Sequence, residues 1–171
     1  MWIRFHEKWV GRRSKESFSR AGSRKDSVIS FKIALDVPEE HCHINLVRQI
    51  GRSLLEHGNT SPQDIDDVEI VLGELCSNVT RHARSEAGHY QVCLEHHGDH
   101  VVVTVADKGC GFDVQHVPPV GTPRPEDDGT LRIGGFGLQL VTMLTDQVEF
   151  SPNHPTGSTV RAKRSLQPPQ P

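Results

Sequence analysis

The stretch "ELCSNVTRHA", residues 74–83, places polar residues at a helical spacing beside an apolar stripe. Glu74, Asn78 and His82 follow one another at i, i+4 steps, so they share one face of a helix. Asparagine is a poor helix former because its side chain competes for backbone hydrogen bonds, which makes Asn78 the hardest of the three to explain as a solvated surface residue. An amide oxygen beside a carboxylate suits Mg²⁺, which prefers hard oxygen ligands. The neighbouring stripe, expected to face a sheet, consists of Leu72, Leu75, Cys76, Val79 and Ala83.

Two glycine-containing segments follow this helix. "DKGCGFD", residues 107–113, comes directly after the apolar run "VVVTVA", and "GGFGLQL", residues 134–140, opens a short helical pattern. Each segment can bring backbone amides close to a ligand, and a helix N-terminus attracts negative charge. Either segment alone is as common as an ordinary glycine turn. The order of all three motifs is much more specific, and neither GxxxxGK[ST] nor the HRD and DFG signatures of protein kinases occur in the chain.

The remaining pattern predicts an α+β domain with helices on one face of a mixed, mostly antiparallel sheet. We expect a strand over 28–37, an amphipathic helix opened by Pro38 and closed by Gly58, and a second helix from Ser61 and Pro62 to about residue 84. Two β-rich runs, 89–97 and 100–107, are separated by a "GD" turn and predict a hairpin. The second run is apolar on both faces and should be central. Residues 114–133 predict a long loop, and a final hairpin should turn around "NHPT".

Charge and composition limit the protein classes to consider. The chain has 171 residues, 35% of them hydrophobic, and a net charge of −3, as expected for one globular domain. Residues 1–27 are basic, and the remainder has a net charge of −8. We find neither a secretory signal nor a run of about 18 apolar residues, so we expect a cytoplasmic protein without a membrane contact. The cysteines show no CxxC pair, which favours reduced thiols; they are Cys42, Cys76, Cys93 and Cys110.

Together, "ELCSNVTRHA", "DKGCGFD" and "GGFGLQL" resemble the N, G1 and G2 boxes of the GHKL ATPase superfamily, whose nucleotide-binding domain has the Bergerat fold. The short length and the "ELxxNxxxHA" pattern are most similar to the anti-sigma factor serine kinases of bacterial partner-switching systems, the RsbW type. The resemblance covers residues 28–164, so we expect a GHKL domain there, a flexible basic extension over 1–27 and a disordered tail over 165–171.

The resemblance implies ATP and Mg²⁺ as cofactors and assigns a role to several residues. Asn78 matches the Mg²⁺ ligand, and Glu74 matches the catalytic carboxylate that acts as general base or orients the nucleophile. Asp107 matches the aspartate that accepts a hydrogen bond from the adenine amine, supported by a hydroxyl of Ser158 or Thr159. The implied nucleotide-binding positions are Asn78, His82, Asp107, Gly109, Gly111, Gly135, Gly137, Leu138, Ser158 and Thr159.

The implied function is that of an ATP-dependent serine/threonine kinase and anti-sigma-type regulator of transcription, which phosphorylates an anti-anti-sigma partner with a STAS domain. A sigma factor or another regulated target, and a second copy of the chain, are further partners that the resemblance allows. Two features depart from the family pattern. Phe136 stands where many relatives have arginine, and the loop contains the acidic residues Glu126, Asp127 and Asp128.

These departures keep two alternatives open. The first is a nucleotide-gated protein-binding switch with little kinase activity. The second is a detached histidine-kinase catalytic domain, which is disfavoured because the N-terminal segment is too short for a dimerisation hairpin. The basic extension does not predict nucleic acid binding, because it has few interleaved aromatic residues beyond Trp2, Phe5, Trp9 and Phe18.

Overall fold

The structure is a computed structural model that describes residues 31–82, 86–109, 123–125, 131–133, 136–153 and 156–167. The helices are α1 (Cys42–His57), α2 (Pro62–His82) and α3 (Phe136–Leu144). The main strands are β1 (Phe31–Pro38), β2 (His89–His96), β3 (His100–Ala106), β6 (Gln147–Pro152) and β7 (Ser158–Ser165). Several positions singled out in the sequence lie outside the described residues: the extension 1–27, Ala83, Cys110, Gly111, the acidic run 126–128 and Gly135.

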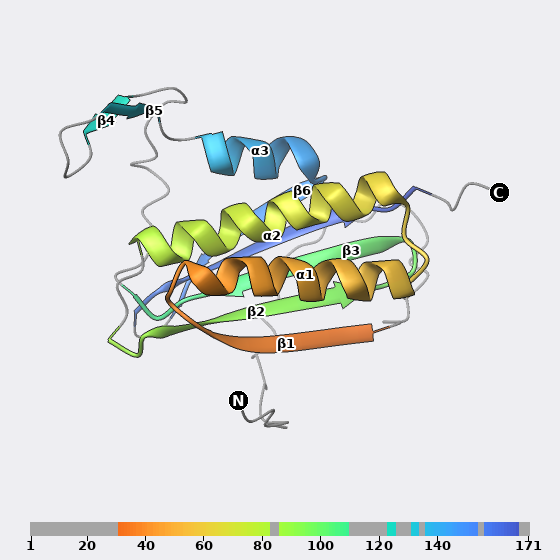
Figure 1. The fold of residues 1–171 in the computed structure, drawn as a ribbon, viewed down its shortest axis with the longest axis horizontal. Coiled ribbons are helices and arrows are strands. Elements are labelled where there is room, and N and C mark those ends of the chain that lie inside the picture. Colours follow the sequence, from red (N-terminus) through yellow and green to blue (C-terminus); the bar gives the residue numbers. More distant parts are fainter. Residues whose placement is uncertain are drawn as a thin grey trace.

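Five strands form one sheet in the order β1-β2-β3-β7-β6 (Figure 1). The run "VVVTVA" lies in β3, the middle strand, as its apolar character on both faces predicted. Both expected hairpins are present, one joining β2 to β3 and the other joining β6 to β7. The sequence predicted a mixed, mostly antiparallel sheet. All pairings between the described strands of this sheet are antiparallel.

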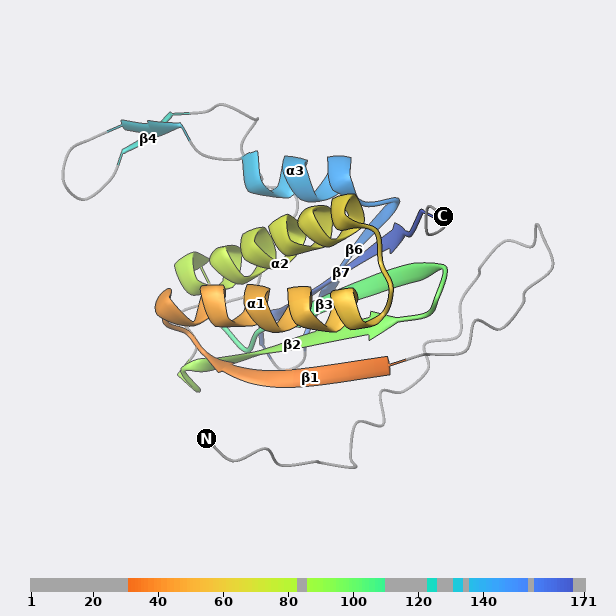
Figure 2. The same ribbon diagram turned by 45° about the vertical axis from the view of Figure 1, so that its right-hand side comes forward.

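The three helices cover one face of the sheet, and α3 lies against α2 (Figures 1 and 2). The predicted apolar stripe of α2 is buried in the core between the helices and the sheet. Facing it are Val92 and Leu94 of β2 and Val103 and Val105 of β3, each about 2% exposed. Burial of each such side chain stabilises the fold by about 1.5–3 kcal/mol relative to leaving it exposed. The α+β class predicted from the sequence is confirmed.

The helix ends follow local sequence signals. The Ser61 hydroxyl accepts a hydrogen bond from the Asp64 amide at 3.1 Å, which is the predicted N-cap of α2. Gly58 ends α1 as expected. The start of α1 is later than the sequence indicated, at Cys42, because the Glu39 amide donates to the Gly88 carbonyl at 3.0 Å and holds this part of the chain beside β2.

Arg164 and Gln167 contact the start of α2. The fully buried Asp64 accepts hydrogen bonds from the Arg164 guanidinium at 2.8 Å and from the Gln167 amide at 2.9 Å. Burial alone would raise the pKa of Asp64, but the hydrogen bonds from Gln167, Ser61 and Arg164 together hold that pKa below its ordinary value. Leu166 packs against the core. Residues 165–167, expected to be part of a disordered tail, are therefore ordered by these contacts.

The segment expected to be a long loop contains two short strands. β4 (Pro123–Pro125) and β5 (Leu131–Ile133) form an antiparallel ribbon of their own, set apart from the main sheet (Figure 2). Within the part of the chain that the structure describes, no helix combines the length and the apolar character needed to cross a membrane.

Candidate functional site

A cleft opens between the C-terminal half of α2, the start of α3 and the ends of the central strands. Its empty space, counted together with the solvent at its open mouth, is about 480 Å³. Most of its wall is apolar, and a few polar side chains converge on it. The lining residues are Leu75, Asn78, Val79, His82, Val105, Asp107, Leu138, Phe150, Ser158 and Val160.

Asp107 lies at the end of β3, where the central strand meets the cleft. Its side chain is only 5% exposed. One carboxylate oxygen accepts a hydrogen bond from the Gly109 amide at 2.8 Å, and the other accepts a short hydrogen bond from the Ser158 hydroxyl. A carboxylate has about four acceptor sites, so Asp107 can still accept a hydrogen bond from a ligand. The buried carboxylate therefore forms a preformed acceptor for a ligand N–H group.

The backbone of Asp107 is fixed by the turn that joins β6 to β7. The Asp107 amide donates to the Ser158 carbonyl at 2.9 Å. The Asn153 side-chain amide donates to the Asp107 carbonyl at 2.7 Å and to the Ser158 carbonyl at 3.1 Å. The Thr156 hydroxyl donates to the Lys108 carbonyl at 3.2 Å. These contacts hold two loops together that are far apart in the sequence.

Gly157 permits this close approach. Its φ of +102° lies in the region that other residues rarely adopt. A Cβ atom at this position would lie 2.1 Å from the Asp107 carbonyl oxygen and 2.8 Å from the Lys108 Cα. Because both of these are backbone atoms, they could not move aside at low cost. Only glycine fits where the β6–β7 turn meets the backbone of Asp107 and Lys108.

The α2 side of the cleft contains the three polar residues of the first motif. Asn78 and His82 line the cleft, and Glu74 lies one turn earlier and is partly buried. The first turn of α3 covers Glu74 closely, since a Cβ atom at Gly137 would lie 2.3 Å from the Glu74 carboxylate. No ion pair joins Glu74 to Arg81 in the described part of the chain.

Ser158 and Thr159, which the sequence could not separate, have different roles in the structure. Ser158 lines the cleft and donates to Asp107, whereas the Thr159 hydroxyl donates to Asn153 at 2.8 Å and so supports the turn. Leu138 also lines the cleft. Gly111 and Gly135 lie outside the described residues.

Asn153 and Gly157 are parts of the site that sequence reasoning missed. Asparagine and glycine in a short connection between strands usually indicate only a turn. Their contact with Asp107 depends on the pairing of β7 with β3, which no local pattern reveals.

An apolar cleft with one buried carboxylate at its end suits a flat heteroaromatic base that presents an amine. A cleft of this chemistry beside an α+β sheet is typical of nucleotide-binding domains. Residues 37–164 match the histidine kinase-like ATPase domain family, and the chain belongs to that family.

Curated relatives include proteins named serine-protein kinase RsbW. The one from Halalkalibacterium halodurans is 30% identical over 122 residues, which are 69% of this chain and 74% of the relative. The one from a Bacillus cereus strain is 26% identical over 141 residues, 80% of this chain and 86% of the relative.

Two solved structures share the fold. The SiaB–SiaC complex from Pseudomonas aeruginosa matches with a TM-score of 0.59 and 16% identity, covering 77% of this chain and 88% of the solved one. The RsbU and RsbW domains of a Mycobacterium tuberculosis protein match with a TM-score of 0.58 and 17% identity, covering 81% of this chain. This chain spans 34% of that longer chain.

Proposed function

We propose that the protein is an ATP-dependent serine/threonine kinase of the RsbW type, which phosphorylates a STAS-domain anti-anti-sigma partner. The observation that carries this proposal is the arrangement of the cleft, with the buried Asp107 at one end and the Glu74–Asn78 face of α2 at the other. Similarity to kinases named RsbW over more than two thirds of the chain supports the same activity.

The cleft fits ATP in a defined orientation. Asp107 accepts a hydrogen bond from the adenine amine, and Ser158 holds the carboxylate in place. The apolar walls pack against the base. The side-chain amide of Asn78 is a suitable ligand for Mg²⁺, which prefers hard oxygen atoms and keeps part of its water shell. ATP supplies the phosphoryl group and Mg²⁺ neutralises the charge on its phosphates.

Glu74 is the proposed catalytic residue. Phosphoryl transfer requires little covalent chemistry from the enzyme, so positioning and charge neutralisation provide most of the rate. The Glu74 carboxylate accepts the proton of the substrate hydroxyl or orients that hydroxyl for attack. Gly137 brings the first turn of α3 against this carboxylate. Glu74 is thus held between two helices rather than exposed on a free surface.

Partner exchange would follow from the phosphorylation state of the substrate. The unphosphorylated STAS protein holds the kinase, and its phosphorylation releases the kinase to bind a sigma factor or another target. The SiaB–SiaC complex shows that a protein with this fold assembles with another chain, which supports protein recognition as part of the function. We place this exchange in the cytoplasm.

A binding switch with little kinase activity is the second candidate. Phe136 favours the binding switch. This uncharged residue begins α3 and is 46% exposed, at a position where many relatives have an arginine. Such a protein would still use Asp107 and Asn78 to bind nucleotide, and nucleotide would still change its affinity for a partner.

Replacement of Glu74 distinguishes the two candidates. In a kinase, Glu74→Gln keeps nearly the full affinity for ATP while phosphate transfer to a purified STAS partner falls by roughly 10²- to 10⁴-fold, the range expected for a positioned acid or base. Transfer is measured with radiolabelled ATP and binding by calorimetry. Glu56→Gln, which changes an exposed carboxylate on α1, serves as the matched control.

If the wild-type protein transfers no phosphate but nucleotide alters its affinity for the partner, the binding switch is correct. If the wild type transfers phosphate and a folded Glu74→Gln variant does so equally fast, Glu74 has no catalytic role.

A further inference from the structure

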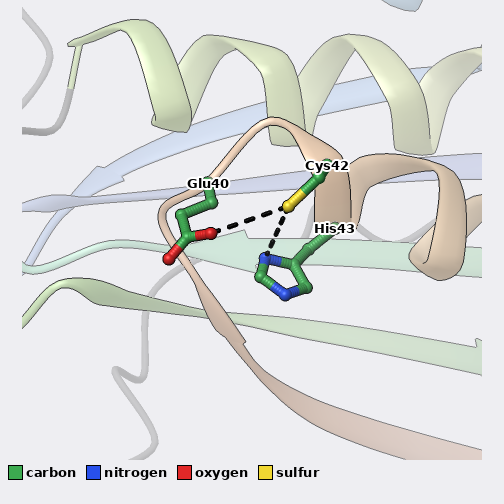
Figure 3. Close-up of side chains that lie close together, drawn as sticks. All are labelled: Glu40, Cys42 and His43. Atoms are coloured by element: carbon green, nitrogen blue, oxygen red, sulfur yellow. Dashed lines mark hydrogen bonds between the residues drawn. The ribbon is translucent and has the colours of Figure 1, made fainter.

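The turn between β1 and α1 brings three metal-ligating side chains together, outside the nucleotide cleft. Glu40 and Cys42 are exposed and His43 is partly buried. Figure 3 shows the Glu40 carboxylate and the His43 ring both directed toward the Cys42 sulfur. The sulfur lies 3.6 Å from Glu40 Oε2 and 3.7 Å from His43 Nδ1, and all three donor atoms lie within 4.8 Å of one another.

The two separations from the Cys42 sulfur match the edge lengths expected for a tetrahedral zinc site. Zinc binds thiolate sulfur at about 2.3 Å, imidazole nitrogen at about 2.0–2.1 Å and carboxylate oxygen at about 2.0–2.2 Å. At the tetrahedral angle, these bond lengths give sulfur–nitrogen and sulfur–oxygen edges of about 3.6 Å. The two observed separations from sulfur, 3.6 and 3.7 Å, are close to these values, and the carboxylate oxygen and ring nitrogen lie within 4.8 Å of each other.

The backbone that carries these ligands is fixed on both sides. Before the cluster, the Glu39 amide donates to Gly88 at 3.0 Å and the Glu40 amide donates to Pro38 at 2.8 Å. Between two of the ligands, His41 Nδ1 lies 3.1 Å from the Thr80 hydroxyl of α2. Cys42 and His43 lie in the first turn of α1. The ligands thus come from a short, anchored segment, and little chain entropy is lost when a metal joins them.

Charge and ligand type favour zinc over the other common divalent ions. A thiolate and a carboxylate together neutralise a divalent cation, and the histidine adds a neutral nitrogen ligand. Mg²⁺ and Ca²⁺ prefer oxygen ligands throughout, whereas a set of sulfur, nitrogen and oxygen suits zinc. The N-terminus of α1 disfavours a cation slightly, and the two anionic ligands outweigh this effect.

We propose that Glu40, Cys42 and His43 form a zinc site with three protein ligands and a fourth position open to water or to another ligand. Binding releases the Cys42 thiol proton to the buffer as the metal–sulfur bond forms. The site is separate from the cleft, because Thr80 contacts its turn from one side of α2 while Asn78 and His82 line the cleft on another. It does not depend on the proposed kinase function.

Titration of the untagged, chelator-treated full chain with Co²⁺, a spectroscopic substitute for zinc, tests the proposal. We expect one equivalent to bind with a thiolate-to-cobalt charge-transfer band and the visible bands of a tetrahedral site. Zinc should displace the cobalt, and calorimetry in two buffers should detect the released proton. Cys42→Ser should abolish the charge-transfer band, and His43→Gln should weaken zinc binding by at least about 10- to 100-fold.

The matched control is the double variant Cys93→Ser/Cys110→Ser, which keeps Cys42 and should retain the full spectrum. Circular dichroism establishes that each variant is folded, and His43→Gln gives an independent reading if Cys42→Ser does not fold. The proposal is overturned if no charge-transfer band forms in the wild type. It is equally overturned if the band persists in Cys42→Ser or if the double variant loses it.

Discussion

The two ends of the proposed nucleotide cleft are constructed differently. At the Asp107 end, Gly109 and Ser158 hydrogen-bond to the carboxylate, and Asn153 binds the backbone behind it. At the α2 end, no hydrogen bond to the side chain of Glu74 or Asn78 comes from another described residue. The proposed base-binding end is thus preorganised by the protein, whereas the proposed phosphate end keeps polar groups available for a ligand.

The two ends therefore have different roles in the proposed function: the Asp107 end selects the base, and the α2 end takes part in phosphoryl transfer. An acceptor held in place before binding loses little entropy when the ligand arrives, and it discriminates strongly between ligands. The side chains of Glu74 and Asn78 have no hydrogen-bond partner among the described residues, so their polar atoms are available for the proposed Mg²⁺ and phosphates. Substitutions at the two ends should therefore have different consequences, which the following experiments compare from the largest expected effect to the smallest.

Gly157→Ala should damage the preorganised end most. A Cβ atom would strike the Asp107 backbone in a conformation already unfavourable for alanine, so we expect the free energy of unfolding to fall by about 3 kcal/mol, the upper end for backbone strain. ATP affinity should fall with it. Urea denaturation and calorimetry measure the two effects.

Gly98→Ala is the matched control, because Gly98 also has a positive φ, +83°, but no atom within 4 Å of the added Cβ. This variant should lose only about 1 kcal/mol, the cost of the left-handed conformation itself. Equal losses in the two variants would show that the contact with Asp107 is unimportant.

Asp107→Asn should weaken ATP binding by about 10- to 100-fold, since a hydrogen bond to a charged group contributes about 1.5–3 kcal/mol. The amide has a single acceptor oxygen, for which Gly109 and Ser158 already compete. Calorimetric titration with ATP and with GTP measures the loss of preference for adenine. Asp99→Asn, which changes an exposed carboxylate in the β2–β3 turn, is the control. A wild type without preference for ATP would contradict the role in base recognition.

Asn78→Ala should have a smaller effect that depends on magnesium. We expect ATP affinity to fall by about tenfold with Mg²⁺ present, at the low end of losses for residues of metal sites, and to change little without it. Calorimetry under both conditions tests this, with Ser77→Ala on the same helix as the control. An equal loss with and without Mg²⁺ would show that Asn78 contacts the nucleotide or stabilises the fold instead.

Local patterns predicted much of the fold. Ser61 is the N-cap of α2, and the apolar run of β3 is central, because capping and two-sided burial depend on residues close in the sequence. The sequence also placed Glu74 and Asn78 on one helix face, since helical spacing fixes that geometry.

The missing information concerns long-range contacts. Strand β7 lies between β3 and β6, and this order brings Gly157 and Asn153 to Asp107. Adjacent strand residues point to opposite faces, so only the register separates Ser158 from Thr159. The Asp64 carboxylate accepts a hydrogen bond from Arg164 of β7, which is 100 positions later in the sequence. No local pattern contains this contact.

The position of β7 has a consequence for the newly made chain. Proteins are synthesised from the N-terminus, and contacts between distant segments can form only after both segments have left the ribosome. The Asp107 carboxylate obtains its Ser158 partner 51 residues later, in the final strand of the sheet. A nascent chain that has finished β3 thus has Asp107 without its Ser158 partner, and the proposed base-binding pocket can form only after β7 has been synthesised.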